Sequence, residues 1–123
     1  MHVLAIDDSR TIREMVRHTL EREGIDTTTA DDGIHGIEVL EGMARKPDAI
    51  LTDVNMPRLD GFGFIQKVRQ QDSFAGIPIL VLTTESAKEL KQRARAAGAT
   101  GWIVKPFDPA RLVVALRTVT GLR

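Results

Sequence analysis

The sequence has no cysteine and no tyrosine, and its 123 residues include only one tryptophan. The lack of cysteine excludes disulfides and thiolate metal sites. No apolar run approaches the roughly 18 residues that a membrane-spanning helix needs. Neither sign of charge is in excess, because 17 Lys and Arg residues balance 17 Asp and Glu residues, so a nucleic-acid or membrane surface is not indicated as the main partner. Since no signal-peptide pattern is present, we expect a cytoplasmic protein.

The charge that is present is distributed unevenly along the chain. Residues 1–85 hold 9 basic and 15 acidic side chains, a balance of −6, whereas residues 86–123 hold 8 and 2, a balance of +6. The length suits a single domain over residues 1–123, and we expect no separate output domain.

Strand-like and helix-period segments alternate throughout, which is typical of βαβ units and a parallel sheet. Strands are expected over residues 3–6, 25–30, 49–53, 77–82 and 102–104. Helices are expected over residues 9–23 and 86–97, after the turn at 31–33, from residue 62 and after residue 109. Helical spacing predicts that Met15 and Ala44 belong to the buried faces of the first two helices. The fold class predicted is α/β with a doubly wound parallel sheet.

Polar groups follow four of the predicted strands. Asp7-Asp8, Asp53, Thr83 and Lys105 each stand at or just after a strand end. Because sites in open parallel sheets lie outside the carboxyl ends of the strands, these groups should converge. Taken singly, each aspartate could instead be a helix cap or a turn residue, but the joint pattern favours a site.

The chemistry of this group of residues favours a hard cation and phosphoryl transfer. Oxygen ligands suit Mg²⁺ better than zinc. A carboxylate such as Asp53 can accept a phosphoryl group, and a lysine with a threonine hydroxyl can stabilise its oxygens. The Lys105-Pro106 bond is of the kind that can be cis.

Several segments together resemble the response-regulator receiver family, and the match extends over the whole chain. They are Asp7-Asp8, Thr52-Asp53-Val54-Asn55-Met56-Pro57, Asp60-Gly61, Thr83-Thr84-Glu85 and Gly101-Trp102-Ile103-Val104-Lys105-Pro106-Phe107. The resemblance is greatest to the single-domain chemotaxis members. It implies a flavodoxin-like (βα)5 fold with the strand order 2-1-3-4-5.

The resemblance also implies a role for each polar group at the strand ends. Asp53 would be the phosphoacceptor, and Mg²⁺ would be bound by Asp8, Asp53 and the backbone carbonyl of Asn55, with Asp7 assisting through water. Lys105 would pair with the phosphoryl group. The chain would then be no conventional enzyme, since it would carry out only its own phosphorylation and dephosphorylation.

The resemblance implies a switch and a set of tuning positions as well. Thr83 would move toward the phosphoryl group and Trp102 would follow it, so that one modification biases two states. Asn55, Thr84 and Glu85 would set the lifetime of the phosphorylated form. The combination of Asn55 and Glu85 leads us to expect a short-lived signal, while a β-branched Thr84 could narrow access to the site.

The basic stretch near the predicted fourth helix suggests a docking surface, although such a stretch is often simply solvated. Receivers commonly contact their downstream partner through this region. The candidate partner face is made of Lys88, Lys91, Arg95 and Trp102.

The function expected is that of a receiver phosphorylated on Asp53 by a histidine kinase with Mg²⁺, in chemotaxis or flagellar motor control. We expect a monomer that signals by contact with a protein such as a flagellar motor switch protein. One alternative is a phosphate sink or phosphorelay shuttle. A second alternative is a haloacid-dehalogenase-like phosphatase, although that family uses Asp-x-Asp where this chain has Asp7-Asp8 followed by Ser9. A third alternative is a degenerate receiver used only for binding, which the intact acidic set disfavours.

Overall fold

The computed structural model describes residues 1–84 and 88–122, which form a five-stranded parallel sheet with helices on both faces. The strands are β1 (His2–Ile6), β2 (Asp26–Ala30), β3 (Ala49–Thr52), β4 (Ile79–Thr83) and β5 (Gly101–Val104). The helices are α1 (Arg10–Glu21), α2 (Gly33–Gly42), α3 (Gly61–Gln70), α4 (Lys88–Ala97) and α5 (Pro109–Thr120). None of the described helices is long and apolar enough to cross a membrane.

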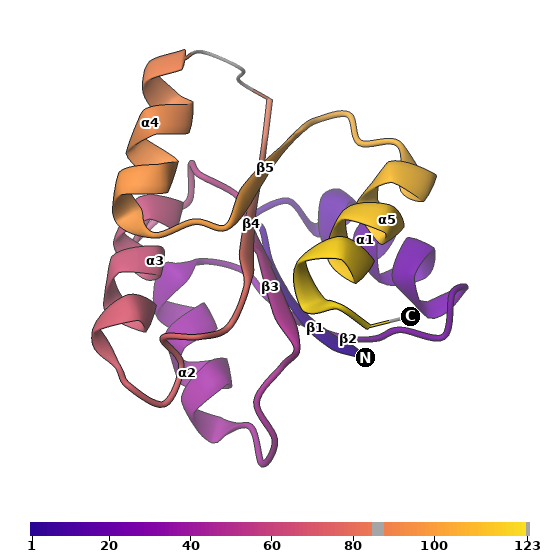
Figure 1. Cartoon of the computed structure of the whole chain (residues 1–123), viewed down its shortest axis with the longest axis horizontal. Helices are drawn as coiled ribbons and strands as arrows, with labels where there is room; N and C mark the ends of the chain where they lie inside the picture. The colour runs from indigo at the N-terminus through magenta and orange to yellow at the C-terminus, as the bar shows by residue number, and fades with distance from the viewer. Residues whose placement is uncertain (85–87, 123) are drawn as a thin grey trace.

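The strands lie in the order β2-β1-β3-β4-β5, as the family resemblance implied. Figure 1 shows α1 and α5 together on one side of the sheet and α2, α3 and α4 on the other. All four strand pairings are parallel, so the carboxyl ends of the strands meet along one edge.

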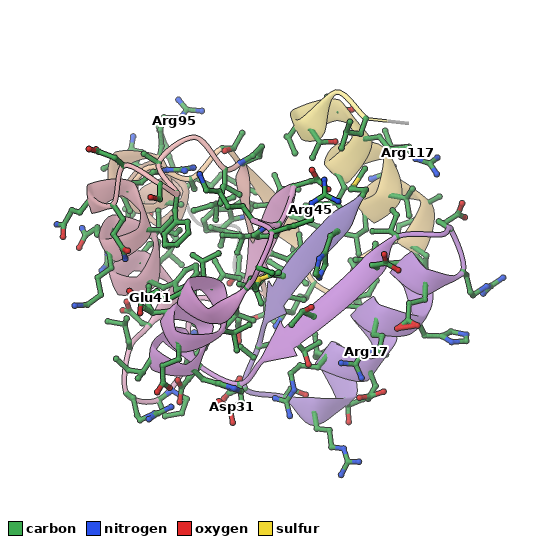
Figure 2. The ribbon with its side chains drawn as sticks, turned by 90° about the horizontal axis from the view of Figure 1, so that it is seen from below. Arg17, Asp31, Glu41, Arg45, Arg95 and Arg117 are labelled. Atoms are coloured by element: carbon green, nitrogen blue, oxygen red, sulfur yellow. The ribbon has the colours of Figure 1, made fainter. Side chains whose placement is uncertain are left out.

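The core has two layers because the central strands are buried on both faces. Alternate residues of β1 separate accordingly: Leu4 and Ile6 pack toward α2, α3 and α4, whereas Val3 and Ala5 pack toward α1 and α5. Figure 2 shows charged side chains such as Glu41 and Arg95 on the outside of these layers.

Helix starts follow the capping residues in the sequence. Ser9 caps α1 by accepting a hydrogen bond from the Ile12 N–H, and Asp32 caps α2 in the same way. Asp108 caps α5, with Pro109 in its first turn. The Lys105-Pro106 peptide bond is cis.

Two predictions about the core are wrong. Met15 is 48% exposed, because it lies at the margin of the apolar stripe of α1, whose buried residues are Val16 and Leu20. Ala44 is exposed, because α2 ends at Gly42, before the helical spacing would turn Ala44 inward. The fourth helix was predicted to begin at residue 86. Residues 86 and 87 lie outside the described residues.

Candidate functional site

The candidate site forms where β1 and β3 end side by side. Ile6 pairs with Thr52, and the Asp53 N–H donates to the Ile6 carbonyl over 2.9 Å. Asp7 and Asp53 therefore leave adjacent strands at the same level. On the far side of β3, Thr83 at the end of β4 pairs with Val104, which places Lys105 immediately beyond the same edge.

Three carboxylates converge at this edge, as the sequence predicted. One oxygen from each of Asp7, Asp8 and Asp53 lies within 4.8 Å of the others. Asp7 is 4% exposed and Asp53 9% exposed, whereas Asp8 is open to solvent. The cluster thus has two buried carboxylates and one at its mouth.

The Lys105 ammonium lies between the two buried carboxylates. Its Nζ is 2.7 Å from Asp7 Oδ2 and 3.4 Å from Asp53 Oδ1. The sequence predicted a lysine that pairs with a phosphoryl group, but the structure shows that Lys105 is already engaged, with Asp7 as its nearer partner. The pairing lets two like charges share a buried site.

The pKa of Asp53 is raised above its ordinary value of 3.8. The first cause is burial, which removes water from the charged form, and the second is repulsion by Asp7. Lys105 and the Val54 N–H, which donates to Asp53 Oδ1 over 2.8 Å, act in the opposite direction without cancelling the rise. The folded chain therefore resists full ionisation of the cluster, which an added cation would relieve.

Two groups that the sequence reasoning did not identify hold Asp7 in place. The Ser9 N–H donates to Asp7 Oδ1 over 2.9 Å, and Arg13 Nη1 donates to the Asp7 carbonyl over 2.7 Å. Arg13 lies in the first turn of α1, four residues after Ser9, and this helical spacing is the sequence signal that could have identified it. The orientation of Asp7 thus depends on α1 as well as on β1.

The remaining predicted positions lie around the same edge. Thr83 is 1% exposed, and its carbonyl accepts a hydrogen bond from the Lys105 N–H. Asn55 and Thr84 are exposed, beyond β3 and β4 respectively. Glu85, predicted to tune dephosphorylation, lies outside the described residues.

The donor set fits a hard divalent cation. The cluster offers carboxylate oxygens alone, with Asp8 accessible from solvent, and the backbone of Asn55 follows Asp53 closely in the chain. Oxygen ligands of this kind are those that Mg²⁺ prefers.

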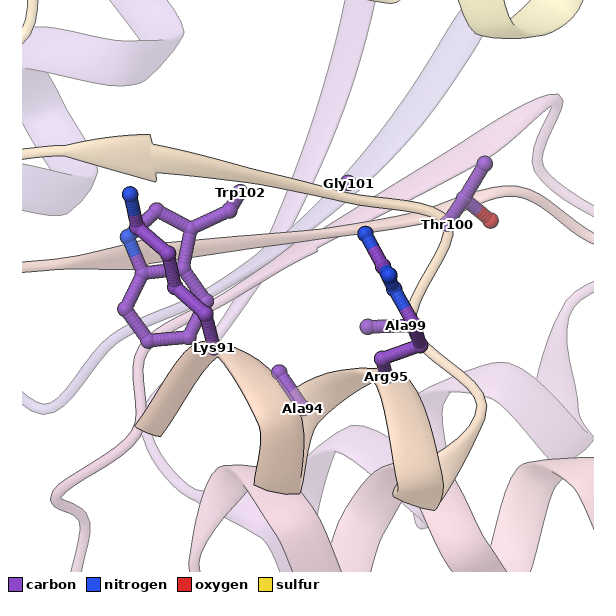
Figure 3. A pocket seen from close by; sticks show the side chains of 7 residues that line it. All are labelled: Lys91, Ala94, Arg95, Ala99, Thr100, Gly101 and Trp102. Carbon is purple, nitrogen blue, oxygen red and sulfur yellow. The ribbon is translucent and has the colours of Figure 1, made fainter. Parts of the chain in front are cut away.

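A separate hollow of about 170 Å³ lies between α4 and β5. Figure 3 shows the Trp102 ring at one side of it, with the Lys91 side chain alongside and Arg95 across from them. Trp102 is half-buried against the core, and its indole Nε1 is buried without a hydrogen-bond partner among the described residues. Three of the four residues of the predicted partner face therefore adjoin this hollow or its rim, and Lys88 begins the same helix.

Comparisons with known proteins agree with this geometry. The family model for the response regulator receiver domain matches residues 3–117. Chemotaxis protein CheY1 of Helicobacter pylori is 37% identical over 123 residues, covering 98% of each chain. The solved structure of Vibrio cholerae chemotaxis protein CheY4 is 47% identical, with a TM-score of 0.90 over 96% of this chain and 97% of that one.

One further solved structure bears on the cation. The receiver domain of the sensor histidine kinase PA1611 of Pseudomonas aeruginosa is 28% identical, with a TM-score of 0.89. The alignment covers 98% of this chain and 97% of that one, and that structure has a magnesium ion coordinated in its active-site cleft.

Proposed function

This chain belongs to the response regulator receiver domain family, and we propose that Asp53 is its phosphoacceptor, charged by a histidine kinase. Members of this family are phosphorylated regulators of two-component systems, and they are signalling proteins rather than conventional enzymes. Single-domain chemotaxis proteins are among its relatives. One observation carries the proposal: Asp53 lies buried at the carboxyl edge of the sheet, beside a second buried carboxylate and an ammonium that contacts both.

In the proposed step, a carboxylate oxygen of Asp53 attacks the phosphorus of a phosphohistidine. The new O–P bond forms as the P–N bond breaks, and the kinase imidazole leaves. The product is an acyl phosphate on Asp53, which water later hydrolyses. The chain's own contribution is to position and orient the Asp53 carboxylate, since the Val54 N–H fixes one of its oxygens.

The proposed cation is Mg²⁺, held by Asp8, Asp53 and the Asn55 backbone carbonyl, with Asp7 assisting through water. When bound, Mg²⁺ neutralises charge on the phosphoryl oxygens. The exposed Asp8 at the mouth of the cluster supports this assignment, because a cation can reach it without rearrangement of the core.

Lys105 and Thr83 are proposed to respond to the phosphoryl group. Lys105 now pairs with Asp7 and Asp53, so a phosphoryl group on Asp53 would offer the ammonium new oxygen partners. Thr83 would donate its hydroxyl to the same oxygens, and Trp102, on the strand that pairs with the strand of Thr83, would follow. Asn55, Thr84 and Glu85 are proposed to set how fast water removes the group.

The proposed output is a contact through Lys88, Lys91, Arg95 and Trp102. The hollow between α4 and β5, with cationic side chains beside an indole, suits an acidic segment of a partner protein. We propose a flagellar motor switch protein as that partner and a cytoplasmic monomer as the active form. A phosphate sink or shuttle differs in having no phosphorylation-dependent partner, and the comparisons do not support the phosphatase alternative.

The direct test is labelling with a small phosphodonor. Incubation with Mg²⁺ and the phosphodonor should add one phosphoryl group to the parent chain, detected as an increase in intact mass. Asp53→Asn should abolish this labelling. Asp72→Asn, at an exposed aspartate of the helix-to-strand loop, is the matched control and should label normally. An unlabelled parent would contradict the proposal.

A pull-down with and without a beryllofluoride-type phosphoryl mimic separates the output hypotheses. A motor-control receiver should bind the switch protein more tightly with the mimic, and Lys91→Glu should weaken that binding. Equal binding in both states would favour the sink or shuttle.

A further inference from the structure

Arg58, in the loop between β3 and α3, has a backbone conformation that a side chain rarely adopts. Its φ is +65°, and among the residues described it is the one non-glycine residue with a positive φ. The Leu59 N–H donates to the Pro57 carbonyl over 2.7 Å, so Arg58 stands at the centre of a three-residue turn. Such a conformation persists only where the surroundings compensate for it.

The compensation comes from a bidentate ion pair with Asp32, the N-cap residue of α2. Arg58 Nε lies 2.7 Å from Asp32 Oδ2, and Nη2 lies 3.0 Å from Oδ1. Asp32 is 5% exposed, and it also caps α2 by accepting from the His35 N–H. The Asp32 carboxylate is therefore also held by a hydrogen bond from α2, so its position does not depend on Arg58 alone.

The same loop is joined to α2 a second time. The Gly33 N–H donates to the Leu59 carbonyl over 3.1 Å, and a Cβ on Gly33 would come within 2.5 Å of that oxygen. At the end of the loop the Gly61 N–H donates to the Val54 carbonyl over 2.8 Å. The segment that contains Asn55 is therefore held between the end of β3 and the first turn of α2.

We propose that Arg58 is a positioning residue for cation binding: its ion pair with Asp32 fixes the conformation of the loop that carries Asn55. This inference rests on the proposed function, in which the Asn55 backbone carbonyl is a ligand of Mg²⁺. Arg58 itself touches neither the cation nor the phosphoryl group. The structural consequence is that the cation site depends on α2 as well as on the strands that carry its carboxylates.

Electrostatics alone and the positioning role predict opposite changes in Mg²⁺ affinity when Arg58 is replaced, so the test can separate them. Removing a positive charge from the neighbourhood of an acidic cluster should tighten Mg²⁺ binding if charge alone matters. If positioning dominates, Arg58→Ala should weaken Mg²⁺ binding about tenfold, the usual cost of losing a residue that orients a metal ligand. Arg58→Gly should weaken it as much, although glycine tolerates the positive φ.

The experiment is a Mg²⁺ titration of the parent and both Arg58 variants by calorimetry, with the amide signals of Val54 and Asn55 followed by NMR. Arg45→Ala, at the opposite end of the sheet beside Met1 and Asp26, is the matched control and should bind as the parent does. Equal or tighter binding by either Arg58 variant would overturn the inference. A parent that binds no Mg²⁺ would instead contradict the proposed function, so the two failures are distinguishable.

Discussion

At the scale of single residues, Lys105 determines the electrostatic state of the site. Its ammonium is shared between Asp7 and Asp53, and the side chains of all three are nearly inaccessible to water. A buried charge that loses its partner is costly, whereas an intact pair contributes modestly. The stability of the folded chain should therefore respond to any change in the charge of this cluster.

Asp53→Asn should stabilise the folded chain at pH 7 by about 1 kcal/mol. The raised pKa of Asp53 means that the folded state disfavours the charged carboxylate, and this penalty is present at pH values above the folded pKa. The penalty disappears as pH falls below the usual value of 3.8, where the carboxyl is protonated in both states. Urea unfolding at pH 7 and near pH 4 should show the difference shrink in acid. A constant difference across that range would contradict the assignment of cause.

Lys105→Met should lower the free energy of unfolding by about 3 kcal/mol in the absence of divalent cations, because Asp7 and Asp53 would face each other unpaired. The exposed Lys67 of α3 supplies the control, since Lys67→Met should change stability by less than about 0.5 kcal/mol. Urea unfolding with a chelator present measures both. Equal effects of the two substitutions would mean that the ion pairs carry no net stability.

At the scale of elements, α2 contacts the loop between β3 and α3 so closely that Gly33, the first residue of α2, has no room for a side chain. Gly33→Ala would push a Cβ against the Leu59 backbone, which cannot move aside as a flexible side chain could. We expect a loss of about 1–3 kcal/mol. Gly42 ends the same helix with open space around it, so Gly42→Ala should stabilise by up to about 1 kcal/mol.

Thermal unfolding of these two variants checks the prediction, because the substitution is chemically identical in both. Opposite signs are expected. A Gly33→Ala variant as stable as the parent would show that the loop between β3 and α3 yields easily.

At the scale of the whole molecule, cation binding should be linked to folding. The acidic cluster comes from separate strand ends, so it exists only in the folded chain. Mg²⁺ at a hundred times its Kd should therefore raise the free energy of unfolding by about 2.7 kcal/mol. Asp8→Asn should remove most of this effect while leaving the cation-free stability near that of the parent, since Asp8 is exposed. Melting curves with Mg²⁺ and with a chelator decide the matter, and an Asp8→Asn chain that responds fully to Mg²⁺ would contradict the ligand assignment.

Much of the fold and the site was predictable because local patterns carried it. Apolar runs predicted the five strands to within two residues at each end. The predicted burial of Met15 and Ala44 was wrong. An amphipathic pattern does not indicate where a helix ends, nor how much of the edge of its apolar face is buried against the sheet. The conformation of Arg58 was not predicted, because no sequence pattern indicates that an arginine adopts a positive φ.

The sequence alone determined the alternation of strands and helices and the convergence of Asp7, Asp8 and Asp53, because parallel strands must bring their carboxyl ends to one edge. Tertiary structure decided what those groups do to one another. It placed Lys105 nearer to Asp7 than to Asp53, set Arg13 of α1 on the Asp7 carbonyl, and joined Arg58 to Asp32 across two loops. These are contacts between segments distant in sequence, and their distances depend on how helices pack on the sheet, which no local pattern encodes.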